Sequence, residues 1–224
     1  MYKKVEAVGK AGVLIFIFLG MQVLIVSLFM LLTGLNGGAF EGYYEEHLYL
    51  VNGVIQLVTL LLLLGWDTLR HKKIREIFNL KINRRWLRYI LYGVELWLFS
   101  SLLNSLLLPF FSDYKWQITQ MFGNQEKGLR FVVLVILVPF LEEYLFRYKI
   151  QGYLKEGFGE TLAILLQGMF FGLIHSMNLQ KIYASVLGIG FGFVREKEGN
   201  LQSSIIMHMT INTIGFFIGS FVSI

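Results

Sequence analysis

The chain has 224 residues, of which 55% are hydrophobic and only 16% are charged. A soluble globular domain usually carries about 25% charged residues, so this composition excludes an ordinary soluble domain. The chain has no cysteine, which excludes disulfides, thiol nucleophiles and cysteine-ligated metals. The excess of 20 Lys and Arg over 15 Asp and Glu is typical of cytoplasmic loops in a membrane protein, rather than of nucleic-acid binding.

Apolar blocks recur along the chain with the length of a membrane-spanning helix. No charged residue lies between Lys10 and Glu41, and a helix of about 20 apolar residues crosses the core of a bilayer. The first block is too long for a signal peptide, so we expect a retained helix. The blocks predict an all-α fold, a polytopic transmembrane bundle of about seven helices. The predicted spans are 11–33, 48–66, 89–111, 129–151, 161–178, 181–195 and 200–222.

The distribution of positive charge predicts the direction of these helices. With the N-terminus inside, segments 1–10, 67–88, 147–160 and 195–199 face the cytoplasm and hold 16 of the 20 Lys and Arg residues. Positive residues are enriched in cytoplasmic loops. We therefore expect a multi-pass protein of the cell membrane with a cytoplasmic N-terminus and an external C-terminus.

The basic segment between the second and third spans has two interpretations. Residues 70–88 resemble a nucleic-acid patch in charge, but they also place Ile74, Ile77 and Phe78 on one helix face. Because the segment adjoins two membrane helices, we favour an interfacial helix against anionic lipid.

Pairs of glycines four residues apart occur in the last three predicted helices, and such pairs let helices approach closely. The pairs are Gly168/Gly172, Gly188/Gly192 and Gly215/Gly219. The stretch GIGFG also resembles a phosphate loop, but no strand precedes it, so helix packing is favoured. The chain thus divides into N-terminal transmembrane helices with a basic loop, residues 1–128, and a tightly packed core, residues 129–224.

Ionisable residues within the predicted spans are few, and such residues indicate function by default, although they can also pair only to hold helices together. Apart from Lys and Arg within two residues of a span end, they are Glu95, Glu142, Glu143, His175 and His208, with Arg147 at the edge of a span. Glu143 and Arg147 are four residues apart, which predicts a charge-neutralising pair on one helix face. Glu142 projects about 100° away from Glu143 around the helix and needs another partner.

The surroundings of Glu142 predict a water-binding place. Pro139 removes a backbone donor, frees the carbonyl of Val135 and tends to kink the helix there. If spans 129–151 and 161–178 form an antiparallel hairpin, Glu142 and His175 lie at the same depth. We expect them to hold one water molecule between them, while a packing role for His175 remains the alternative.

The last predicted helix carries a pair of hydrogen-bond donors. His208 and Asn212, in HMTIN, are four residues apart and project from one face. Donors fixed in a dry site stabilise an oxyanion. Together with Glu142, they predict general-base activation of water and a stabilised tetrahedral intermediate.

Other hydrolytic sites fit the sequence less well. The two aspartates, Asp67 and Asp113, are predicted at opposite membrane faces, and neither G-x-S-x-G nor H-E-x-x-H occurs. A zinc site is still possible, because two histidines and a glutamate can bind this metal. Its ligands would be Glu142, His175 and His208. We expect no cofactor and no metal, since Asn212 suits an oxyanion better than zinc.

Three motifs now identify a family resemblance. EEYLFR, FGLIH and HMTIN fit E-E-x-x-x-R, F-x-x-x-H and H-x-x-x-N in that order. Over residues 135–215 the chain resembles the CAAX protease and bacteriocin-processing family, also called CPBP or Abi, which are intramembrane glutamic proteases. The resemblance implies that Glu142 and His175 activate the water. It implies an oxyanion hole of His208 and Asn212. Glu143 and Arg147 would support the site, and residues 129–224 would form the catalytic core.

The resemblance implies the class of substrate but leaves an alternative. Family members include prenyl-protein proteases that remove the last three residues of a prenylated C-terminus, and bacterial members linked to bacteriocin maturation, immunity and peptide-signal processing. The expected partners are a peptide or membrane-associated protein substrate and the lipid bilayer, without nucleic acid. The alternative is a non-proteolytic membrane immunity or scaffold protein, in which the motif residues only pack helices.

Overall fold

The structure is a computed structural model that describes residues 2–78, 84–123 and 126–222, and within these residues all regular structure is helical. This confirms the predicted all-α class. In chain order the elements are α1 (Tyr2–Thr33), α2 (Gly37–Glu46), α3 (Leu48–Leu69), α4 (Ile74–Phe78), α5 (Arg85–Leu107), η1 (Leu108–Phe110), α6 (Tyr114–Gly123), α7 (Lys127–Phe131), η2 (Val132–Leu137), α8 (Val138–Glu142), η3 (Glu143–Ile150), α9 (Gln151–Phe158), α10 (Glu160–Leu173), α11 (Asn178–Glu198) and α12 (Leu201–Val222).

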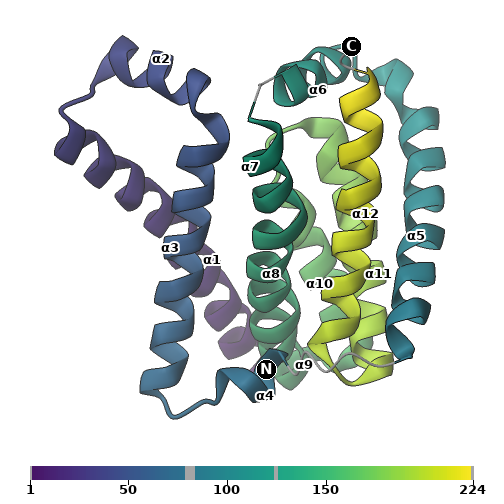
Figure 1. Cartoon of the computed structure of the whole chain (residues 1–224). Helices are drawn as coiled ribbons and strands as arrows, with labels where there is room; N and C mark the ends of the chain where they lie inside the picture. The colour runs from purple at the N-terminus through teal and green to yellow at the C-terminus, as the bar shows by residue number, and fades with distance from the viewer. Residues whose placement is uncertain (1, 79–83, 124–125, 223–224) are drawn as a thin grey trace.

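Four helices of the described chain are long and apolar enough to cross a membrane, and α10 is a shorter apolar helix. The four are Tyr2–Thr33, Leu48–Leu69, Arg85–Phe110 and Leu201–Gly219. The other three predicted spans correspond to the stretch α7–α9, to α10 and to α11. Successive spans run in opposite directions through the molecule (Figure 1). The number of about seven crossings stays a prediction.

Two predicted helix ends are wrong, and both matter for the candidate site. Helix α10 ends at Leu173, so His175 lies in the turn that follows instead of within a span. The predicted span 129–151 continues through η3 and α9 to Phe158, so Arg147 and Lys149 are buried inside the bundle rather than in a cytoplasmic loop. Both residues pair with carboxylates within the protein, so the helix can continue past them into the bundle.

Helices α10 and α11 pack closely through glycines, as predicted. A Cβ atom on Gly172 would lie 1.9 Å from Ser185 Oγ, and one on Gly188 would lie 3.0 Å from Gly168 Cα. Only residues without side chains allow these backbones to approach so far. The prediction is wrong for Gly215, because a Cβ there would meet nothing within 4 Å.

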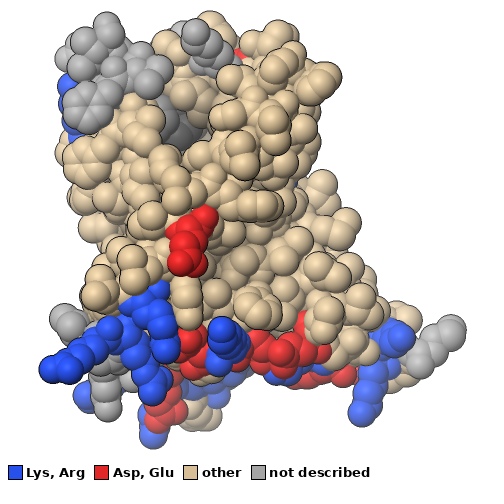
Figure 2. Space-filling view, turned by 90° about the vertical axis from the view of Figure 1, so that its right-hand side faces the viewer, with Lys and Arg blue, Asp and Glu red and all other residues tan. Residues whose placement is uncertain are grey.

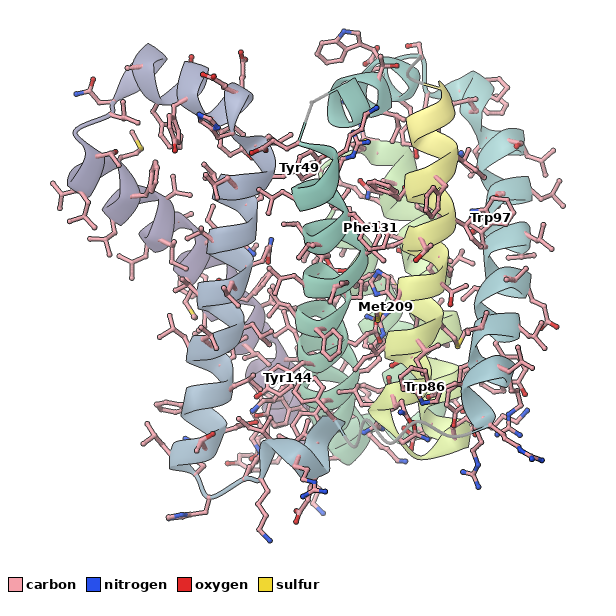
Figure 3. The ribbon with its side chains drawn as sticks, viewed as in Figure 1. Tyr49, Trp86, Trp97, Phe131, Tyr144 and Met209 are labelled. Atoms are coloured by element: carbon pink, nitrogen blue, oxygen red, sulfur yellow. The ribbon has the colours of Figure 1, made fainter. Side chains whose placement is uncertain are left out.

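Polar contacts join α3 to the α7–α9 stretch near both ends of α3. Tyr49 takes part at one end and Tyr144 at the other (Figure 3). At one end the backbone N–H of Tyr49 donates to Glu126 Oε2 at 3.0 Å. At the other end the hydroxyl of Tyr144 donates to Asp67 Oδ2 at 2.6 Å, and Lys149 pairs with the same carboxylate. Asp67 was expected at a membrane face, but it is buried because it neutralises Lys149.

The segment between α3 and α5 is only partly interfacial. Residues 74–78 form α4, and Phe78 is buried against the rings of Phe140 and Tyr144, with ring centroids 5.7 and 5.9 Å away. Phe78 therefore packs on the protein rather than facing lipid. Residues 79–83 of the predicted interfacial helix lie outside the described residues.

Charged side chains gather at one end of the molecule, where α9 ends and α12 begins (Figure 2). Arg88 pairs with Glu198 at 2.6 Å, and Lys155 pairs with Glu160 at 3.3 Å. We refer to this as the charged end. It is the end that the distribution of positive residues assigns to the cytoplasm.

Cysteine labelling tests this orientation without background, because the chain has no native cysteine. Ala39, in α2, and Lys73, at the charged end, are both exposed. In intact cells a membrane-impermeant maleimide is expected to modify Ala39→Cys, and to modify Lys73→Cys only after lysis. The reverse pattern would show that the N-terminus lies outside.

Candidate active site

His208 of α12 lies between the carboxylates of two consecutive residues. Its Nδ1 is 2.9 Å from Glu143 Oε1, and its Nε2 is 3.8 Å from Glu142 Oε2. An ionised carboxylate only accepts hydrogen bonds, so Nδ1 carries a hydrogen and donates it to Glu143. At 3.8 Å, Nε2 faces Glu142 without a direct hydrogen bond. Glu143 thus fixes the orientation of a ring whose other nitrogen faces Glu142.

Glu143 also forms the ion pair that its spacing from Arg147 predicted. Arg147 Nε lies 3.2 Å from Glu143 Oε2, and neither side chain is exposed. The guanidinium lies over the rings of Phe171 and Phe191, with distances of 4.2 and 5.1 Å from Cζ to the ring centroids. A fully buried Glu143 therefore has a positive partner on one side and His208 on the other.

The ring of Phe171 brings the two histidines together. His175 packs against it with ring centroids 5.0 Å apart, and His208 packs edge-on at 5.9 Å. His208 also stacks on Phe191 at 4.9 Å. The motifs FGLIH and HMTIN therefore meet, as their place in the predicted bundle required.

The backbone selects one tautomer of His175. Its Nδ1 lies 2.7 Å from the carbonyl oxygen of Phe171, and a carbonyl only accepts, so Nδ1 carries the hydrogen. In the neutral ring, Nε2 then has a free lone pair. Glu142 and His175, both among the described residues, make no direct hydrogen bond or ion pair with each other, so the shared water stays a prediction.

Asn212 has an interaction that the sequence did not indicate. Its side-chain amide donates to the carbonyl oxygen of Leu134 at 2.7 Å. In η2 the backbone follows a π-helical pattern, in which the N–H of Val138 donates to Val133, five residues back. The next bond of this pattern would join residue 139 to Leu134, but Pro139 has no N–H. In this pattern the carbonyl of Leu134 therefore has no helical donor, and the amide of Asn212 supplies one.

A family comparison can now be placed beside this geometry. Residues 124–214 match the family described as Type II CAAX prenyl endopeptidase Rce1-like, and they include all six motif residues. The match covers less than half of the chain, and it supports the resemblance of this segment to the CAAX protease family. No curated protein and no solved structure matches the chain.

Within the segment that matches this family model, the candidate residues differ in access. Glu142 is 15% exposed, whereas the side chain of Glu143 is fully covered. His175 and Asn212 are half-buried. Glu95 is exposed on α5 and is not part of the site. Glu142 is therefore the carboxylate that a water molecule and a substrate can reach.

The described residues do not gather into a metal site. They contain no group of three or more His, Cys, Asp or Glu side chains that could hold a metal ion. In particular, Glu142, His175 and His208 do not form such a group. His208 instead directs one nitrogen to each of two carboxylates.

The hydrogen bond from Asn212 to the Leu134 carbonyl makes a prediction about stability. Asn212→Ala is expected to lower the free energy of unfolding by about 1–3 kcal/mol, because it leaves the Leu134 carbonyl without a donor. In a Pro139→Ala background, residue 139 regains an N–H, so the cost should shrink. Thermal unfolding of the four proteins in detergent measures this coupling. An equal cost in both backgrounds would contradict the π-helical assignment of the vacant carbonyl.

Proposed function

We propose that the chain is an intramembrane endopeptidase of the glutamic type, which hydrolyses a peptide bond with a water molecule activated by Glu142 and His175. The observation that carries the proposal is the placement of His208 between Glu142 and Glu143. With Arg147 the two carboxylates leave one uncompensated negative charge, and burial disfavours such a charge. One proton on either Glu142 or His208 makes the cluster neutral. The cluster therefore suits chemistry that takes up and returns one proton.

The hydrolytic step follows from these hydrogen-bond roles. Glu142 takes a proton from the water while the water oxygen bonds to the carbonyl carbon of the substrate. His175 Nε2 accepts a hydrogen bond from the other hydrogen of the water. The C=O electron pair moves onto oxygen and gives a tetrahedral oxyanion. The C–N bond then breaks, and Glu142 returns its proton to the departing amine.

The oxyanion needs donors, and two are available in this arrangement. With its proton on Nε2, His208 donates from that nitrogen while Nδ1 remains bound to Glu143. The amide of Asn212 has two hydrogens, of which one is used by Leu134. The second supports the proposed oxyanion hole.

A prenylated C-terminal peptide is the first substrate to test, because the matching family is described as a prenyl endopeptidase. Purified protein in detergent is expected to release the C-terminal tripeptide from a farnesylated CAAX-type peptide, as detected by mass spectrometry. In parallel, peptides that accumulate in cells carrying Glu142→Ala would show other substrates. If neither assay detects any difference between wild type and Glu142→Ala, the scaffold alternative replaces this proposal.

Metal independence is a separate prediction. The His208 and Asn212 donors can supply the charge stabilisation that a metal would otherwise give. Peptidase activity is expected to persist after prolonged treatment with 1,10-phenanthroline and EDTA, with no stoichiometric zinc by elemental analysis. Loss of activity that added zinc restores would show instead that Glu142, His175 and His208 are metal ligands of a metalloendopeptidase.

A further inference from the structure

A stripe of polar residues leads from the candidate site toward the charged end. Glu143, Arg147, Gln151 and Lys155 follow one another at intervals of four along η3 and α9. The first three are fully buried, whereas the side chain of Lys155 is 43% exposed. A buried stripe of this kind needs a hydrogen-bond partner for every polar group.

Polar contacts join the residues of this stripe at both of its ends but not in its middle. Glu143 pairs with Arg147 at 3.2 Å. Further along, Gln151 Nε2 donates to Glu196 Oε2 at 3.1 Å, and Glu196 pairs with Lys155. The break therefore lies between the guanidinium of Arg147 and the amide of Gln151.

Unpartnered buried atoms of opposite kinds lie on the two sides of this break. Arg147 Nη1 and Nη2 have hydrogens to donate, and neither has a hydrogen-bond partner within the described protein. The same is true of two acceptors, Gln151 Oε1 and Gln167 Oε1. The Nε2 atoms of both glutamines are bonded to backbone carbonyls, those of Gly192 and Gly188.

The helix registers place these groups next to one another. The side-chain amides of Gln151 and Gln167 meet beside Gly192, where a Cβ atom would lie 2.9 Å from Gln151 Oε1 and 2.4 Å from Gln167 Nε2. Gln151 is one turn from Arg147, and Gln167 is one turn from Phe171, whose ring lies under the guanidinium. The two amides are thus on the side of Arg147 that faces the charged end.

A ligand at this place must accept hydrogen bonds from the guanidinium and donate them to the amide oxygens. A fully deprotonated anion cannot donate, and a cation would be repelled by Arg147. Water does both, and buried water usually makes about three hydrogen bonds to such groups. We propose that a bound water molecule bridges Arg147 to Gln151 and Gln167, and that these glutamines are positioning residues for the Arg147–Glu143–His208 chain.

Radiolytic footprinting tests the hydration site without any substrate. Hydroxyl radicals formed from bound water oxidise side chains beside it, so Phe171 and Phe191 are expected to react severalfold faster than Phe18. All three are buried, and Phe18 is the most exposed of them, so exposure alone predicts the opposite order. In Gln151→Leu/Gln167→Leu, the rates for Phe171 and Phe191 should fall severalfold below their wild-type values.

The outcomes separate the proposal from simple packing. Oxidation of Phe171 and Phe191 no faster than Phe18 in the wild type would overturn the proposal, and so would rates in the leucine variant that are unchanged from the wild type. If the double variant does not fold, Gln167→Leu alone replaces it, and a smaller fall in the oxidation rates is expected.

The positioning role, which rests on the proposed function, predicts a lower kcat with unchanged KM in Gln151→Leu. If the wild type had no peptidase activity, the proposed function would fail. Footprinting would still decide whether the bound water is present, because it needs no substrate.

Discussion

Glu142→Gln is expected to lower the peptidase rate by about 10²–10⁴-fold, the range typical of losing a general base. Glutamine keeps the shape of the side chain but cannot take a proton from water. Little stability should be lost, because Glu142 is partly exposed and lies 3.8 Å from His208, too far for a direct hydrogen bond. The measurement is kcat on a peptide that the wild type cleaves, together with thermal unfolding in the same detergent.

A matched control for this change lies on the same helical stretch. Glu156 of α9 has a side chain that is 70% exposed, so Glu156→Gln removes one carboxylate at the charged end and should leave kcat unchanged. Equal rates for Glu142→Gln and wild type would exclude Glu142 as the base. The motif residues would then have only the structural role that a scaffold protein requires.

The features that the sequence predicted correctly are those that depend on residues close together in the chain. The long apolar blocks became helices, because a helix satisfies its backbone hydrogen bonds within one segment of the chain. The Glu143–Arg147 pair formed because residues four apart share a helix face. The glycines of α10 and α11 meet because the two helices are consecutive and antiparallel.

The features that were missed depend on relations between distant helices or on small changes of helical register. The contact between Glu143 and His208 joins residues 65 apart, and no spacing rule places η3 beside α12. In a π-helix, Pro139 withholds its missing N–H from Leu134, whereas in an α-helix it would withhold it from Val135. The sequence around Pro139 does not distinguish the π-helical from the α-helical pattern. One missed contact did have a signal. Asp67 and Lys149 lie near the ends of two predicted spans that finish on the same side of the membrane. Their similar depth could have predicted that they form an ion pair.

Replacing Glu143 is expected to have the largest effect on stability. Glu143→Gln should lower the free energy of unfolding by about 3–5 kcal/mol, because it leaves the buried charge of Arg147 without a counter-ion. Adding Arg147→Met removes that charge, and replacing a whole buried ion pair by apolar groups is often neutral. The double variant should therefore recover most of the lost stability. Thermal unfolding of wild type, single and double variants measures this.

A second double variant separates stability from catalysis. In Glu143→Gln/Arg147→Met, the glutamine oxygen can still accept the hydrogen of His208 Nδ1, whereas Glu143→Ala/Arg147→Met removes that acceptor. Both lack the buried charge pair, so any difference in kcat between them reports the orientation of His208. We expect the alanine version to be slower by about 10- to 100-fold, since small misplacements of a catalytic group cost this much. Equal kcat in the two proteins would mean that Glu143 serves only as the counter-ion of Arg147. The orientation of His208 would then have to come from its stacking on Phe191.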